Sequence, residues 1–263
     1  MHTIYKIRLL LFLITITISS VSSQIIESSH FCIDLDEWES IGTITDGYTI
    51  TSFLDEAERY YDYIYFQLKS SKMSNSSSKK CRIYIVESGV EVNRCIGNAI
   101  YLDKSFIGRN FTPLAHEITH LILYCRSLES LSEGLADYYQ NYFITKDGIN
   151  EPYYNGNVQE KIKVLWKNEF SYNRLEKILD GYLSNYFSII EAQSFVQFVI
   201  EKYGMIKFIQ YFDGGGYVSY ETIFNKSRKE IIEQWIEYIN SVVSNQIWED
   251  NWEEINRYYF PDK

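Results

Sequence analysis

His116-Glu117-Ile118-Thr119-His120 is the stretch that decides how this chain is interpreted. Thr112 and Pro113 precede it and predict a helix start, with Thr112 as the N-cap and Pro113 as the first helical residue. Residues four apart share a helix face, so His116 and His120 are expected to point the same way. Apolar residues at helical spacing predict that another side is buried and that the histidine side faces a cleft; they are Leu114, Ile118, Leu121 and Ile122.

A second motif, Ser132-Glu133-Gly134-Leu135-Ala136-Asp137, places Glu133 thirteen residues after His120. A helix that opens near Ser130 or Ser132 would carry Glu133 and Asp137 on one face, because they are four residues apart. Two imidazoles and one carboxylate are the three protein ligands of an open catalytic zinc site. The sequence therefore predicts that His116, His120 and Glu133 bind one Zn²⁺.

Two further carboxylates fit the same chemistry. Zinc lowers the pKa of a water molecule to about 7, and Glu117 could take the proton of that water as it attacks a carbonyl. Asp137 could accept the second ring N–H of one histidine and so fix its tautomer. The reaction predicted is hydrolysis of a peptide bond. The alternatives are an amphipathic helix with two buried, hydrogen-bonded histidines, and two solvated acids on a helix surface.

The motifs HEITH and LSEGLADYY resemble those of the gluzincins, in particular the peptidase MA-like family of zinc metallopeptidases. Residues 192–204 are similar to the helix that follows the site in that family, and a later helix with Gln234-Trp235 is similar as well, so the resemblance covers residues 81–243. It implies an α+β, zincin-like fold. A small N-terminal sheet would pack on the helix of His116, with a mainly helical C-terminal lobe and a cleft between the lobes.

The resemblance also implies a strand that binds substrate and a group that stabilises the oxyanion. The candidate strand is Ala99, Ile100 and Tyr101, because an extended peptide can pair with a strand that borders the cleft. Aminopeptidase relatives carry Gly-x-Met-Glu-Asn there, whereas this chain has Gly97-Asn98-Ala99-Ile100-Tyr101, which favours an endopeptidase. Tyr186 is the candidate oxyanion donor, with a core or surface role as the alternative. Relatives place this tyrosine a few residues later, where Ile189 and Ile190 stand here.

Residues 1–23 resemble a secretory signal peptide, with Lys6 and Arg8 before an apolar run and Val21-Ser22-Ser23 at the end. We therefore expect a secreted protein without stable membrane association. The alternative is an uncleaved anchor over residues 7–21. Loss of two basic and no acidic residues would change the formal charge from −10 to −12, which argues against nucleic acid as a partner. The acidity could favour basic substrates or simply maintain solubility.

Export predicts two disulfides among the four cysteines, Cys32, Cys81, Cys95 and Cys125. Three pairings are possible; we favour Cys81–Cys95 across two neighbouring strands, with Cys32–Cys125 joining the N-terminal segment to the zinc helix. A rival interpretation makes Cys32 a thiolate that caps the zinc. Three sequons predict glycosylation, at Asn75, Asn110 and Asn225.

Residues 24–263 are long enough for one catalytic domain, with an α/β lobe at 24–126 and a helical lobe at 127–263. Periodicity predicts strands at 82–86 and 99–102. Helices are predicted at 53–68, 158–170, 189–203, 205–212 and 227–243, the last with a capping box of Ser227 and Glu230. Two functions are compatible with these motifs. One is a secreted zinc peptidase that cleaves peptide or protein substrates, and the other is a zinc-stabilised binding protein of the same fold without turnover.

Overall fold

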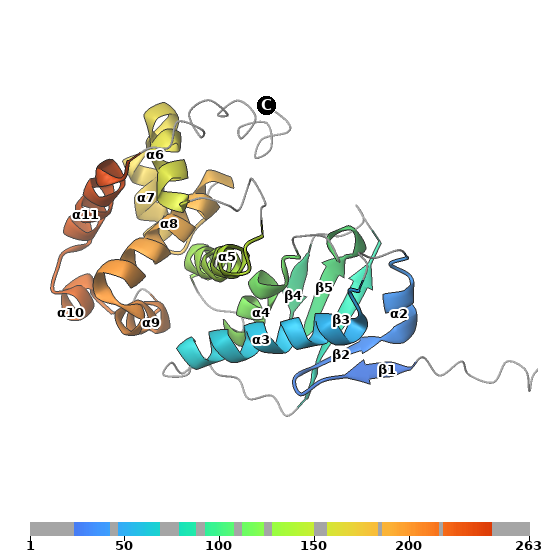
Figure 1. The fold of residues 1–263 in the computed structure, drawn as a ribbon. Helices are drawn as coiled ribbons and strands as arrows, with labels where there is room; N and C mark the ends of the chain where they lie inside the picture. The colour runs from blue at the N-terminus through green and yellow to red at the C-terminus, as the bar shows by residue number, and fades with distance from the viewer. Residues whose placement is uncertain are drawn as a thin grey trace, which may run out of the picture.

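The computed structural model describes residues 24–42, 47–68, 79–87, 93–107, 112–123, 128–149, 157–183, 186–215 and 218–243. A sheet forms the N-terminal part of the molecule, and helices form most of the rest (Figure 1). This confirms the expected α+β class with a small N-terminal sheet and a mainly helical C-terminal part. The segment predicted as a signal peptide lies outside the described residues. Within them, no helix is long and apolar enough to cross a membrane.

The sheet has five strands in the order β1-β2-β3-β5-β4. Strands β2, β3 and β5 run parallel, whereas β1 and β4 pair antiparallel at the two ends. The bounds are β1 (Ile25–Glu27), β2 (Phe31–Asp34), β3 (Cys81–Val86), β4 (Arg94–Ile96) and β5 (Ala99–Asp103). The sequence predicted β3 and β5. The other three contain only three or four residues, too few for an alternating pattern to show.

Helix α2 (Leu35–Glu39) follows β2, and helix α3 (Ile50–Leu68) packs against β2 and α4 (Leu114–Leu123). A short 3-10 turn, η1 (Lys104–Phe106), follows β5. Helix α3 begins three residues earlier than predicted, because Thr49 and Ser52 exchange hydrogen bonds at its start. The Ser52 amide donates to Thr49 Oγ1 at 3.1 Å, and the Thr49 amide donates to Ser52 Oγ at 2.8 Å.

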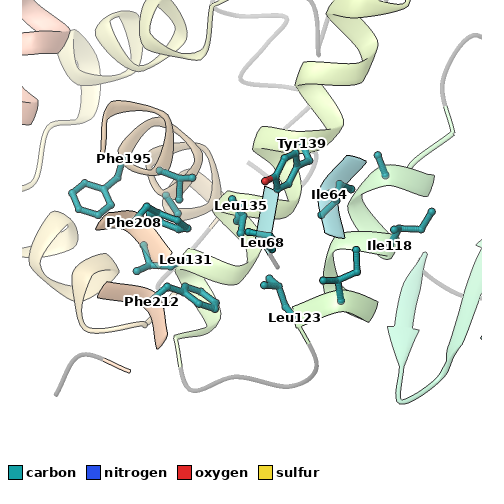
Figure 2. Packing of buried hydrophobic residues seen from close by; sticks show 14 of the residues in the cluster. Ile64, Leu68, Ile118, Leu123, Leu131, Leu135, Tyr139, Phe195, Phe208 and Phe212 are labelled. Atoms are coloured by element: carbon teal, nitrogen blue, oxygen red, sulfur yellow. The ribbon is translucent and has the colours of Figure 1, made fainter. Parts of the chain in front are cut away.

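Helix α5 (Glu129–Lys146) contacts α4 on one side and α8 (Tyr186–Tyr203) on the other, and it lies in the middle of the view in Figure 1. Its buried leucines, Leu131 and Leu135, lie between residues of α3 and α4 and aromatic residues of the later helices (Figure 2). Most of the buried apolar residues in the described part of the chain form one cluster that runs from the sheet through α5 to the C-terminal helices. Residues far apart in the sequence are thereby held around α5.

The remaining helices are α6 (Val158–Glu169), α7 (Tyr172–Leu179), α9 (Met205–Asp213), α10 (Tyr220–Phe224) and α11 (Arg228–Ser241). Helices α6, α9 and α11 confirm their predictions within two residues, and the capping box of Ser227 and Glu230 is present. Helix α8 begins at Tyr186 instead of residue 189. The short helices α7 and α10 were not predicted, and each begins at a serine N-cap, Ser171 or Ser219.

A buried polar cluster joins the three helices α6, α8 and α11. Gln159 of α6 donates to the Ser194 carbonyl of α8 at 3.0 Å, and the Ser194 hydroxyl donates to Gln159 Oε1. Trp235 Nε1 of α11 donates to Ser194 Oγ at 3.0 Å. All three side chains are buried and hydrogen-bonded, which is the condition under which buried polar groups are tolerated.

Candidate metal centre

Helix α4 presents both histidines of the first motif on one side. Leu114, Ile118 and Ile122 are buried, whereas the His116 and His120 side chains stay 19% and 20% exposed. This matches the predicted division between a buried apolar side and a histidine side at three of the four apolar positions; the fourth, Leu121, is half-buried. The Nε2 atoms of the two histidines lie 3.0 Å apart, so both rings are directed at one point.

The start of α4 differs from the prediction. The helix begins at Leu114, and the Thr112 hydroxyl donates to the Phe106 carbonyl at 2.9 Å instead of accepting a helix amide. Gln140 of α5 fills the capping role: its Oε1 accepts the His116 amide at 3.0 Å. Gln140 was not predicted, because a cap supplied by another helix leaves no signal in the local sequence.

Helix α5 brings Glu133 to the two histidines. Glu133 Oε2 lies 3.3 Å from His116 Nε2, and Glu133 Oε1 lies 3.3 Å from His120 Nε2. The three residues form a group able to hold a metal ion, with all three donor atoms within 4.8 Å of one another. The structure therefore brings together the three residues that the sequence predicted as zinc ligands.

The spacing of these donor atoms fits zinc. Bonds of about 2.0–2.2 Å in a tetrahedral site place neighbouring ligand atoms about 3.4 Å apart. His116 Nε2 and His120 Nε2 lie 3.0 Å apart, and each lies 3.3 Å from a different oxygen of Glu133, His116 from Oε2 and His120 from Oε1. The Glu133 side chain is 28% exposed, so the three-donor group is partly open to solvent. Two imidazoles and one carboxylate with an accessible face are the donor set of a catalytic zinc site.

The second nitrogen of each histidine is held by α5. His116 Nδ1 lies 2.8 Å from Asp137 Oδ1; a proton on Nδ1 donated to this carboxylate would leave the lone pair of Nε2 for a metal ion. This is the contact predicted for Asp137. His120 Nδ1 lies 3.2 Å from Ser132 Oγ. Ser132 was considered only as a helix start, although its place directly before Glu133 could have indicated a contact with a ligand.

Glu117 is 3% exposed, and its Oε2 atom has no hydrogen-bond partner. Burial raises the pKa of the Glu117 carboxyl, an effect that the nearby His116 and His120 oppose. A buried carboxylate oxygen without a donor is energetically costly, so it is expected only where it has a use. An acceptor beside the histidines is what a general base requires.

The electrostatics of the ligands are those of a preorganised negative site. Burial alone would lower the pKa of His116, but its hydrogen bonds to Asp137 and Glu133 raise it well above its ordinary value. Burial opposes ionisation of Glu133 as well, yet contacts with the two histidines lower the pKa of its carboxyl. The carboxylates thus stabilise a positive charge on His116, and the two histidines stabilise the negative charge of Glu133.

Helix α8 supports α5 directly behind the ligand. A Cβ placed on Gly134 would lie 2.6 Å from the Ala192 carbonyl carbon and oxygen, so only glycine allows the two helices to approach this closely. One residue on, Gln193 Nε2 donates to the Asp137 carbonyl at 3.2 Å. The backbone that carries Glu133 and Asp137 is therefore fixed from the side opposite α4.

The substrate-binding role expected of Ala99, Ile100 and Tyr101 needs a correction. These residues lie in β5, an interior strand: Ile100 is paired with Ile83 of β3 and with Cys95 of β4. Because the backbone groups of β5 are used on both sides here, an added strand cannot pair with them. Strand β4 stands at the end of the sheet order instead and, like β5, contacts α4.

The cysteine prediction is also corrected. Cys81 carries a free thiol, so it is not bridged to Cys95, and β5 separates the two strands that were expected to be neighbours. Cys32 is free as well and lies on β2, beside Arg82 of β3 and outside the ligand group, which removes the basis for a cysteine cap on the zinc. Its expected partner, Cys125, lies outside the described residues.

The described residues test little of three other predictions: the role of Tyr186, the glycosylation sites and the cleft between the lobes. Tyr186 is the first residue of α8, but its side chain lies outside the described part, so its role as an oxyanion donor stays a prediction. Asn225 is exposed and ends α10 in a left-handed conformation with φ 55°. Asn75 and Asn110 lie outside the described residues. The cleft expected between the two lobes stays a prediction as well.

Comparison with known proteins adds no assignment: no family model, curated protein or solved structure matches this chain. Its function has to be argued from the geometry of the centre.

Proposed function

We propose that this protein is a secreted zinc metallopeptidase of the gluzincin type, in the peptidase MA-like family, with one zinc ion per chain. His116, His120 and Glu133 would hold the metal, and Asp137 and Ser132 would orient the two histidines. The observation that carries the proposal is Glu117: its Oε2 atom is buried without a hydrogen-bond partner, and its carboxyl interacts electrostatically with His116 and His120, two of the three residues that could hold a metal ion. A zinc that only stabilised the fold would have no use for that oxygen.

Zinc, when bound, supplies a Lewis acid that polarises a carbonyl and lowers the pKa of water to about 7. Glu117 takes a proton from the attacking water and can then give it to the leaving amine as the peptide bond breaks. The low exposure of Glu117 keeps bulk water from competing for that proton. Asp137, which lies 2.8 Å from His116 Nδ1, would hold a proton on that nitrogen and so leave the Nε2 lone pair for the metal.

An extended peptide is the substrate that suits this arrangement. We place its backbone along β4, where Arg94–Ile96 form the end strand of the sheet and the strand contacts α4. Ile96 is 53% exposed and could contact a substrate side chain. The sequence Gly97-Asn98-Ala99-Ile100-Tyr101 has no acid to hold a free amine, which favours cleavage within a chain.

The second candidate is a zinc-stabilised binding protein of the same fold. The observation in its favour is that Ile189 and Ile190 stand where relatives carry the oxyanion-stabilising tyrosine. The experiment is to measure zinc content and cleavage of an unbiased peptide library for the wild type and His120→Ala. Zinc with cleavage in the wild type and loss of both in the variant supports the peptidase. Zinc without cleavage supports the binding protein, and a metal-replete wild type without zinc rejects both.

A further inference from the structure

Gln140 is a buried glutamine on α5 whose whole amide group is used at the start of α4. Its side chain is 3% exposed. Oε1 accepts the His116 amide at 3.0 Å, and Nε2 donates to the Thr112 carbonyl at 3.2 Å. The Gln140 side chain thus connects the Thr112 carbonyl, just before α4, to the His116 amide in the first turn of α4.

The His116 amide needs such an acceptor. It is the third amide of α4, and the first amides of a helix have no partner within the helix. Thr112, the residue placed to cap it, directs its hydroxyl to Phe106 instead. The Pro113 carbonyl is already the acceptor for Glu117 at 3.1 Å. Gln140 therefore supplies a bond that α4 does not make within itself.

Gln140 shares a face of α5 with two residues of the metal centre. Glu133, Asp137 and Gln140 are spaced by four and then three residues, which places them in one stripe along the helix. Asp137 holds the His116 ring at 2.8 Å while Gln140 holds the His116 backbone at 3.0 Å. The face of α5 that carries Glu133, the proposed third ligand, therefore contacts both the ring and the backbone amide of His116.

From this geometry we infer that Gln140 is a positioning residue of the proposed zinc centre. It sets the axial register of α4 against α5, and with it the distance from His116 and His120 to Glu133. The amide is the suitable group because the site offers one donor and one acceptor. A carboxylate could accept from the His116 amide but would repel the Thr112 carbonyl, and an apolar group would leave both unpaired.

The inference rests on the proposed zinc site and is tested by metal binding instead of turnover. The full-length secreted protein and its Gln140→Met variant would be titrated with zinc against a competing chelator. Their cobalt-substituted forms would be compared by visible absorption, which reports the geometry of the ligands. Gln159→Met is the matched control, because Gln159 is equally buried and also bridges two helices, but lies on α6 bonded to Ser194. Folding of each variant would be checked by circular dichroism.

We expect Gln140→Met to bind zinc about 10–100-fold more weakly per folded molecule, as for outer partners of metal ligands, with an altered cobalt spectrum. Gln159→Met should lose stability but keep the wild-type affinity and spectrum. If Gln140→Met keeps the wild-type values too, Gln140 is a structural residue only and the inference is wrong. A wild type that binds no zinc overturns the inference and the proposed function together, so the two failures are distinguishable.

A second variant covers the case in which Gln140→Met does not fold. Gln140→Glu keeps the acceptor for His116 and the size of the side chain but removes the donor to Thr112. A shifted zinc affinity together with a changed cobalt spectrum supports positioning. Values identical to those of the wild type overturn it.

Discussion

Gly134 and Ala192 lie in backbone contact: a Cβ added to Gly134 would come within 2.6 Å of both the carbonyl carbon and the carbonyl oxygen of Ala192. The contact joins α5 to α8 one residue after Glu133. Because the opposing atoms belong to the backbone, no side chain can rotate away to make room. The position of Glu133, the proposed third ligand, is thus coupled to the packing of α8 against α5.

Gly134→Ala should therefore destabilise the protein although alanine is the better helix former. Overpacking is expected to cost about 1–3 kcal/mol, against a helix-propensity gain of about 1 kcal/mol. Zinc affinity should fall as well, because α5 must shift. The measurements are urea unfolding and zinc titration. Adding Ala192→Gly should not rescue the variant, since the clash involves atoms that glycine keeps; full rescue would show that the contact has been misjudged.

The contact of Asp137 with His116 should contribute more to zinc affinity than the contact of Ser132 with His120. Asp137→Asn replaces a charged acceptor on His116 Nδ1 and should weaken zinc binding about 10–100-fold. Ser132→Ala removes a neutral contact of 3.2 Å to His120 and should have a smaller effect, because hydrogen bonds with a charged partner are about twice as strong. Competition titrations with a chelator measure both. A larger loss from Ser132→Ala than from Asp137→Asn would contradict this ranking.

A buried ion pair outside the centre should contribute to stability without affecting the metal. Arg174 Nε and Nη2 donate to the Glu191 carboxylate at 2.6 and 2.8 Å, and Trp166 Nε1 donates to it at 2.8 Å. The Glu191 side chain is fully buried, so Arg174→Met should cost about 3–5 kcal/mol by leaving its charge unpaired.

Adding Glu191→Gln should restore part of that loss, because the neutral amide no longer carries a buried charge and can still accept from Trp166. Thermal unfolding of the single and double variants tests this, with zinc affinity as the control expected to stay constant. Equal stability of the single and double variants would argue against an unpaired charge as the cause.

Glu58 on α3 should make stability depend on pH on the acid side. Burial alone would raise the pKa of its carboxyl, but hydrogen bonds from the His30 amide at 2.6 Å, Ser28 at 2.5 Å and the His30 ring at 2.6 Å lower it below its ordinary 4.5. The unfolded chain then binds the proton more readily than the folded one. The stabilisation is present above pH 4.5 and is lost as the pH falls through the folded pKa.

Urea unfolding of the wild type and Glu58→Gln at pH 7 and at pH 3 checks this. The free energy of unfolding of the wild type should exceed that of Glu58→Gln at pH 7, and the difference between the two proteins should be smaller at pH 3. A difference of equal size at the two pH values would show that the carboxylate charge does not contribute.

The residues of the proposed ligand set could be predicted to share helix faces because this depends on local geometry. The i and i+4 spacing fixes which residues share a helix face, so His116 with His120, and Glu133 with Asp137, follow from the sequence once two helices are assumed. The structure adds that these two faces meet. Gln140, by contrast, was missed because its partners belong to another helix, and nothing near residue 140 indicates how α4 packs on α5.

The sheet shows where local patterns mislead. Strand β5 was predicted correctly, but its place between β3 and β4 depends on the pairing of Arg94–Ile96, a strand of only three residues. Because of that pairing, the free edge of the sheet is β4 and not Ala99–Tyr101, as had been predicted. The pairing also separates Cys81 from Cys95, which the prediction had placed on neighbouring strands. Strand order is a tertiary property, and a short edge strand carries almost no periodic signal.

The most direct test of the proposed function is the Glu117→Gln variant, measured for zinc stoichiometry and for peptide cleavage beside the wild type. Glutamine keeps the shape of the side chain and cannot act as a base, and Glu117 is not among the three proposed ligands. We predict one zinc per chain in both proteins, cleavage by the wild type, and no cleavage by the variant. Cleavage by Glu117→Gln at the wild-type rate would contradict the assignment of Glu117 as the base on which the proposed function rests.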